Sequence, residues 1–133
     1  MQTTLFYIHD PMCSWCWGYR PTWLKLQASL PENIKIKYLL GGLAADTDRP
    51  MSIDMQHSIA GHWRKIQTML GTEFNFDFWD NCSPRRDTYK ASRAVVVAAQ
   101  QGLEEEMIKA IQHALLFTRN ESIRAGYSGA VGQ

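Results

Sequence analysis

Two cysteines near the start of the chain are spaced for redox chemistry. Cys13 and Cys16 enclose Ser14 and Trp15 in a CxxC motif that follows a strand-like apolar run by a short turn and opens a helical pattern. A cysteine at a helix start faces unpaired backbone N–H groups and the positive end of the helix dipole, which favour thiolate over thiol. We therefore expect Cys13 to be a reactive thiolate. Cys16 lies on the same side of the first turn, so the two sulfurs can form a disulfide.

The pair predicts thiol–disulfide exchange. Cys13 would form a mixed disulfide with a substrate, and Cys16 would resolve it or restore the Cys13–Cys16 bond. Because the electrons reside on the two sulfurs, no cofactor is expected. The expected partners are proteins or small molecules that carry thiols or disulfides.

The motif has two other interpretations. A zinc knuckle would need two further ligands, and the candidates stand at spacings unlike those of zinc motifs: Cys82, His9, His57, His62 and His113. The pair could also belong to a non-enzymatic module and be merely buried. The strand–turn–helix setting favours redox chemistry, and no metal site is predicted.

The residues beside the pair are candidates for tuning it and for a rim that docks the substrate. Ser14 and Trp15 lie between the cysteines, and His9 and Pro11 precede them in the turn. His9 would stabilise the Cys13 thiolate if the turn folds back, although a histidine at a strand end needs no role. Trp15 fits an apolar rim or the core equally well.

The third cysteine has a simpler interpretation. Cys82 comes just before a predicted helix start, where a thiol can be activated, but free cysteines are commonly buried as small apolar side chains. Three cysteines are also too few and too unevenly placed for a structural disulfide framework.

The elements that must position the CxxC motif form a strand–helix–strand pattern. Residues 3–8 favour a β-strand, bulky residues over 13–30 recur at helical intervals, and residues 33–40 alternate between apolar and lysine side chains. Such a βαβ unit has parallel strands and a right-handed crossover.

Further helices are expected after this unit. Apolar periodicity predicts them, with Ser83 as the N-cap of the middle helix and Pro84 in its first turn. The predicted segments are helices over 50–70, 84–101 and 104–118, an aromatic-rich loop over 72–81 and a tail over 119–133.

Composition excludes several classes of protein. A chain of 133 residues makes one folding unit, and 14 Lys and Arg against 13 Asp and Glu give a net charge of +1, so nucleic acid and acidic membranes are not expected partners. No apolar run approaches the roughly 18 residues of a membrane helix. The start of the chain has no basic segment, long apolar stretch or cleavage site of a secretory signal, which favours the cytoplasm.

Four segments of the chain carry a family resemblance: Asp10-Pro11-Met12-Cys13-Ser14-Trp15-Cys16-Trp17-Gly18-Tyr19, Gly41-Gly42-Leu43, Asn81-Cys82-Ser83-Pro84 and Ala91-Ser92-Arg93-Ala94. Through them the sequence resembles the DsbA family of thioredoxin-fold disulfide oxidoreductases, and within it the FrnE-like branch. The resemblance implies that Cys13 is the nucleophile, Cys16 its buried partner and Ser14-Trp15 the dipeptide that tunes redox poise. It also implies a helical subdomain inserted into the thioredoxin fold.

The resemblance covers about residues 3–118. In the family, the insertion is followed by two strands, a last helix and a cis-proline loop that faces the CxxC motif, but this chain has no proline after Pro84. We therefore expect an α/β fold with a thioredoxin-like βαβ unit over 1–45, a DsbA-type helical insertion over 46–118 and a tail over 119–133. The C-terminal ββα half would be missing or supplied by another chain. A two-stranded parallel sheet is unfavourable alone, so we expect a homo-oligomer.

Overall fold

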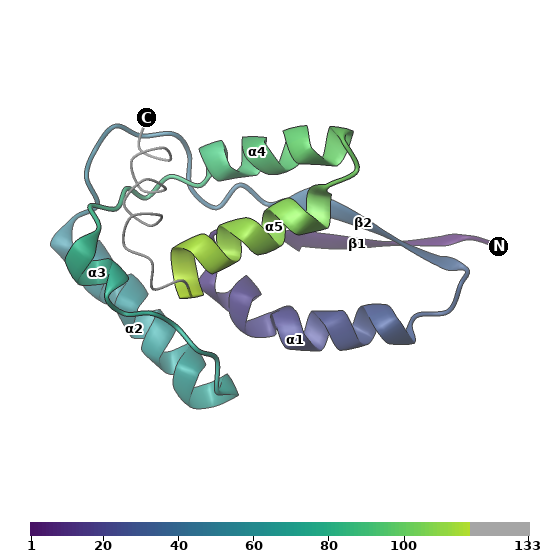
Figure 1. Ribbon diagram of the computed structural model, residues 1–133, viewed down its shortest axis with the longest axis horizontal. Coiled ribbons are helices and arrows are strands. Elements are labelled where there is room, and N and C mark those ends of the chain that lie inside the picture. Colours follow the sequence, from purple (N-terminus) through teal and green to yellow (C-terminus); the bar gives the residue numbers. More distant parts are fainter. Residues whose placement is uncertain (118–133) are drawn as a thin grey trace.

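A strand–helix–strand unit begins the structure, a computed structural model that describes residues 1–117 (Figure 1). Strand β1 spans Thr3–His9, helix α1 spans Ser14–Ser29 and strand β2 spans Ile34–Leu40. The two strands pair in parallel, with Tyr7 opposite Tyr38. The predicted βαβ unit and the α/β class are confirmed.

Helices make up the rest of the described chain. Helices α2 and α3 lie beyond the end of the sheet where both strands finish, and α4 and α5 run alongside it (Figure 1). No helix among residues 1–117 is long and apolar enough to cross a membrane. The bounds are α2 Ile53–Leu70, α3 Phe78–Asn81, α4 Tyr89–Gln100 and α5 Glu104–Gln112, after which His113–Phe117 forms a π-helical turn.

One face of the sheet is covered by helices. The Tyr7 ring stacks on Trp23 of α1 at a centroid distance of 4.0 Å. The Tyr38 hydroxyl donates a 2.6 Å hydrogen bond to the Glu105 carboxylate of α5. Aromatic contacts and this hydrogen bond therefore hold α1 and α5 against the same face.

The opposite face of the sheet is bare among the described residues. Phe6, Ile8 and Leu39 point to this side and are 52%, 67% and 41% exposed. Strand residues alternate between the two faces of a sheet, and the exposed positions follow this period along both strands.

An aromatic core joins α2 to the segment that follows it. Trp63 of α2 stacks on Phe74 at 5.0 Å and contacts Phe78 of α3. Leu116 packs in the same cluster and is fully buried. The segment over 72–81, predicted as a loop, thus contains a short helix and supplies much of this core.

The helix predicted over 84–101 begins later than its local signals indicate. Its first residue is Tyr89, because the preceding residues form hydrogen bonds with the loop after β2. The Asp87 carboxylate accepts from the Thr47 N–H at 3.1 Å, and the Thr88 hydroxyl accepts from the Ala44 N–H at 3.1 Å. These contacts hold the segment outside the helix, so Ser83 is not the N-cap.

The other two helix predictions agree closely with the structure. The helix predicted over 50–70 begins at Ile53, because the Ser52 side chain caps it by accepting from the Met55 N–H at 3.2 Å. It ends before Gly71, whose φ of 70° is in the left-handed region that glycine readily adopts. The helix predicted over 104–118 corresponds to α5 with its π-helical turn. The predicted tail lies outside the described residues.

Candidate active site

Cys13 stands at the N-terminus of α1, as predicted. It has an extended N-cap conformation, with φ −73° and ψ 121°, and its carbonyl accepts from the Trp17 N–H at 3.1 Å. Its own N–H donates to the Asp10 carbonyl at 3.1 Å, which closes the turn between β1 and α1. The thiol therefore stands at the positive end of a 16-residue helix.

The Asp10 side chain holds this turn in place through two hydrogen bonds. One carboxylate oxygen accepts from the Met12 N–H at 2.8 Å, and the other accepts from the Leu43 N–H at 3.0 Å. The side chain is 4% exposed. It thus joins the loop that carries Cys13 to the loop that leaves β2. In the sequence, Asp10 stands out only as the first residue of a segment that carries the family resemblance, with no role of its own.

The pKa values of the two thiols are shifted in opposite directions. The pKa of Cys13 is lowered to about 6, first by a hydrogen bond from the Cys16 thiol and then by the backbone N–H groups of Cys16 and Trp15. Burial and the negative charge of Asp10 act against this shift. The same thiol–thiolate hydrogen bond and burial raise the pKa of Cys16 well above its ordinary value. Both cysteines are free thiols in this structure.

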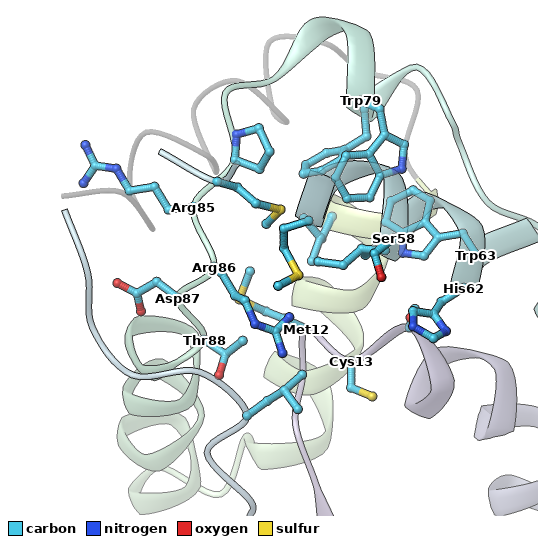
Figure 2. A pocket seen from close by; sticks show the side chains of 18 of the residues that line it. Met12, Cys13, Ser58, His62, Trp63, Trp79, Arg85, Arg86, Asp87 and Thr88 are labelled. Atoms are coloured by element: carbon cyan, nitrogen blue, oxygen red, sulfur yellow. The ribbon is translucent and has the colours of Figure 1, made fainter. Parts of the chain in front are cut away.

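A cavity of about 350 Å³ opens beside Cys13 (Figure 2). Ser14 and Trp15 line it from α1, and Trp15 is 38% exposed. Apolar side chains of α2 and α3 form much of the wall, and polar groups face the space from α2 and from the segment before α4. The apolar lining residues include Met51, which precedes α2, and Met55, Ile59, Trp63 and Trp79 of the two helices; the polar ones include Ser58, His62, Arg85 and Arg86.

Arg86 brings an available positive charge to this cavity. Among residues 1–117 it has no hydrogen bond or ion pair, and its side chain is exposed. The cavity therefore combines an apolar wall, a cation and an acidic thiol, and its volume lies within the range of small-molecule sites.

His9 and Pro11 do not lie on the substrate rim, where the sequence analysis placed them. His9 is 4% exposed, and Pro11 is among the most deeply buried side chains. His9 lines a second cavity, of about 30 Å³, behind Cys16. The turn does not fold back to bring His9 over Cys13. Side chains alternate along β1, so His9 lies with Tyr7 on the covered face of the sheet.

The other candidate ligands are not gathered into a metal site. Cys82 is half-buried against the aromatic core, as expected for a small apolar side chain. His113 packs edge-on against Trp17 at 5.2 Å. Within residues 1–117, no group of three or more His, Cys, Asp or Glu side chains could hold a metal ion.

Comparison with known proteins gives a consistent set of relatives. No family model matches the chain. Its structure is similar to the "putative protein disulfide isomerase" of Nitrosomonas europaea, with a TM-score of 0.76, 28% identity and coverage of 96% of this chain and 61% of that one. It is also similar to the cytosolic disulfide reductase DsbM of Pseudomonas aeruginosa, with a TM-score of 0.67, 26% identity and coverage of 98% and 65%.

Two further comparisons extend this picture. The structure of DsbM with GSH matches with a TM-score of 0.68 and 26% identity, and it covers 98% of this chain and 66% of that one. The ClpXP adapter protein SpxH of Halalkalibacterium halodurans is 27% identical over 97 residues, which are 70% of this chain and 31% of that protein. The chain thus spans less than two thirds of the length of each relative.

The architecture and these likenesses agree with each other. A two-stranded parallel sheet with surrounding helices matches the corresponding part of disulfide oxidoreductases of known structure. The chain therefore has a DsbA-like, thioredoxin-type fold and resembles the disulfide oxidoreductases of this family.

Proposed function

We propose that the chain is a thiol–disulfide oxidoreductase that acts through Cys13 and Cys16. The observation that carries this proposal is the asymmetry of the pair. The pKa of Cys13 is lowered to about 6, whereas Cys16 is kept as a thiol that donates a hydrogen bond to it. A nucleophile next to a protonated partner is the arrangement that exchange through a mixed disulfide requires.

The reaction has two steps. The Cys13 thiolate attacks one sulfur of a substrate disulfide, forms a mixed disulfide and releases the other substrate half as a thiolate. Cys16 then loses its proton and attacks the Cys13 sulfur, which releases the second half. Two electrons pass from the protein dithiol to the substrate, and the reverse sequence oxidises a substrate dithiol.

The cavity beside Cys13 is the proposed binding site for the substrate. Its apolar wall would bury an apolar portion of a protein or small-molecule disulfide, and Arg86 would attract a carboxylate. The similar DsbM has a structure with GSH, a small thiol that bears carboxylates. A glutathione-type disulfide is therefore our first candidate, and the cytosolic description of DsbM supports a cytoplasmic location for this chain.

Exchange with oxidised glutathione tests the proposal. We expect wild-type protein to reduce it in a single turnover and to become oxidised at Cys13 and Cys16, as mass spectrometry of the digested protein would detect. Cys13→Ser should lose this reaction. Cys82→Ser should retain it, because Cys82 packs on the aromatic core and not in the cavity beside Cys13. Full exchange by folded Cys13→Ser protein would disprove the mechanism.

A second candidate is a binding module without catalytic activity. The curated relative SpxH is described as an adapter protein, and the sheet of this chain presents an apolar face. This alternative predicts that Cys13→Ser protein keeps every binding function and that the wild type shows no exchange. Stoichiometric zinc that disappears in Cys13→Ser would instead support a zinc-binding CxxC.

We also propose that two copies associate through the bare sheet face. Phe6, Ile8 and Leu39 are exposed there, and a parallel sheet of two strands normally needs cover on both faces. A second copy would supply the same apolar surface, as a two-fold symmetric dimer requires.

A further inference from the structure

His9 is buried without a partner for its ring nitrogen. Its Nε2 atom is inaccessible to solvent and has no hydrogen bond within the described chain, and the residue is 4% exposed. The ring stacks on Tyr7 at 5.6 Å and contacts the edge of Tyr38 at 5.4 Å. Buried polar nitrogens normally have a protein or water partner, so this atom calls for an explanation.

A small polar cavity adjoins this ring. Its volume is about 30 Å³, and His9 and Cys16 both line it. One water molecule needs at least roughly 10–15 Å³ and two to four polar partners. The lining supplies such partners from β1, α1, β2 and α5, namely Tyr7, Arg20, Gln27, Tyr38, Glu105 and Gln112.

We propose that His9, through one water molecule in this cavity, accepts the proton that Cys16 must lose when it resolves a mixed disulfide on Cys13. The inference rests on the proposed function and adds a residue that moves a proton in its second step. Because His9 acts through the water, it is a positioning and proton-accepting residue and does not touch the reacting sulfurs.

The other groups around the cavity are less suited to this role. The Glu105 carboxylate already accepts hydrogen bonds from Tyr38 at 2.6 Å and Gln27 at 2.9 Å, which lower its pKa. The Arg20 guanidinium carries no free lone pair and donates to Gln112 at 3.2 Å.

The groups nearest to Cys16 are also poor acceptors. The Tyr7 hydroxyl is hydrogen-bonded to Cys16, but its pKa is raised by burial and by nearby Cys16, so it remains a phenol. Both Asp10 oxygens accept from backbone N–H groups. Burial lowers the pKa of His9 despite the adjacent charge of Asp10, so its imidazole is neutral and has a lone pair.

These groups account for every proton and bond in the resolving step. The Cys16 Sγ–H proton passes to the water, and a water proton passes to His9. The Cys16 thiolate then attacks Cys13 Sγ, the Cys13–substrate bond breaks, and the substrate leaves as a thiolate. His9 then releases its proton through the water to solvent, and the released thiolate takes up one proton from solvent, so protons balance and the step requires no further oxidant or reductant.

Single-turnover reaction with Ellman's disulfide separates the two steps. Reduced protein should release one equivalent of thionitrobenzoate when Cys13 attacks and a second when Cys16 resolves the adduct. We expect His9→Gln to leave the first phase unchanged and to slow the second by about a hundredfold near neutral pH, the lower end of the usual range of general-base effects. The exposed His57 of α2 provides a matched control, and His57→Gln should alter neither phase.

The pH profile distinguishes proton transfer from a structural role. In wild type, the second phase should level off above the pKa of His9, whereas in His9→Gln it should keep rising with hydroxide concentration. An unchanged second phase with an unchanged pH profile would overturn the inference. Absence of the first phase in wild type would instead contradict the proposed function.

A measurement on wild-type protein covers the case in which His9→Gln does not fold. Magnetisation transfer in NMR should detect a long-lived water beside the His9 ring in the dithiol form. Absence of such a water would contradict the inference, regardless of the behaviour of the variant.

Discussion

The two cysteines have different chemistry although they belong to the same helical turn. Cys13 is at the helix start, where backbone N–H groups and the Cys16 thiol stabilise negative charge. Cys16 is one turn deeper and faces aromatic rings on the covered side of the sheet. A single hydrogen bond between the thiols thus lowers one pKa and raises the other, which makes Cys13 the attacking group.

Asp10 moderates this acidity while it holds the loop in place. Its buried carboxylate raises the pKa of both cysteines by charge repulsion, yet its two hydrogen bonds join the Cys13 loop to β2. The position of the nucleophile therefore depends on a group that opposes its ionisation. The cysteine pKa is lowered because hydrogen bonds to Cys13 outweigh this repulsion and burial.

At the scale of elements, Gly18 sets the distance between α1 and α2. A Cβ atom at this position would lie 2.6 Å from Cγ2 of Ile66, whose side chain is fully buried. We expect Gly18→Ala to destabilise the fold by roughly 1–3 kcal/mol, the usual effect of overpacking. Chemical denaturation followed by circular dichroism would measure it.

Gly61 of α2 is the matched control for this prediction. A Cβ atom there would come no closer than 3.9 Å to another group, so Gly61→Ala should stabilise the protein by about 0.5–1 kcal/mol through helix propensity. If both alanine variants were equally stable, close helix packing at Gly18 would be excluded.

The strand–helix–strand unit could be predicted from the sequence because its signals are local. The alternating residues of β2 do form a strand, and the chain does turn at His9-Asp10-Pro11, where β1 ends. The start of α4 could not be predicted, because Asp87 and Thr88 form hydrogen bonds with residues about 40 positions away. Such tertiary contacts override a local cap signal.

In the candidate site, too, some features follow from the local sequence and others depend on tertiary contacts. The CxxC pair was recognisable from its spacing and its setting at a helix start. The roles of His9 and Asp10 were not, since they depend on which face of β1 each side chain occupies and on a loop some 30 residues later. Much of the wall of the cavity beside Cys13 comes from α2 and α3, and no local pattern specifies where these helices lie relative to Cys13.

At the scale of the whole molecule, the bare sheet face leads to a prediction about association. We expect the protein to form dimers in analytical ultracentrifugation and Ile8→Lys to shift it toward monomer, because a lysine would leave a charge in the apolar contact. Leu103 is 48% exposed and precedes α5, away from this face, so Leu103→Lys should leave the dimer intact. A wild type that stays monomeric at high concentration would contradict the proposed dimer.

The reactivity of Cys13 underlies the whole account. Alkylation by iodoacetamide proceeds through the thiolate, so its rate against pH reports the cysteine pKa. We expect the rate at Cys13, located by mass spectrometry, to rise with a midpoint near pH 6 and to leave the thiol mostly ionised at neutral pH. Cys16→Ala should move this midpoint upward, because it removes the hydrogen bond that contributes most to the shift.

The outcome is decisive in both directions. A midpoint near pH 6 in folded, reduced wild-type protein would support an activated nucleophile at the helix start. A midpoint near 8.5, the value of an ordinary free cysteine, would contradict the central claim that this chain exchanges disulfides through an acidic Cys13.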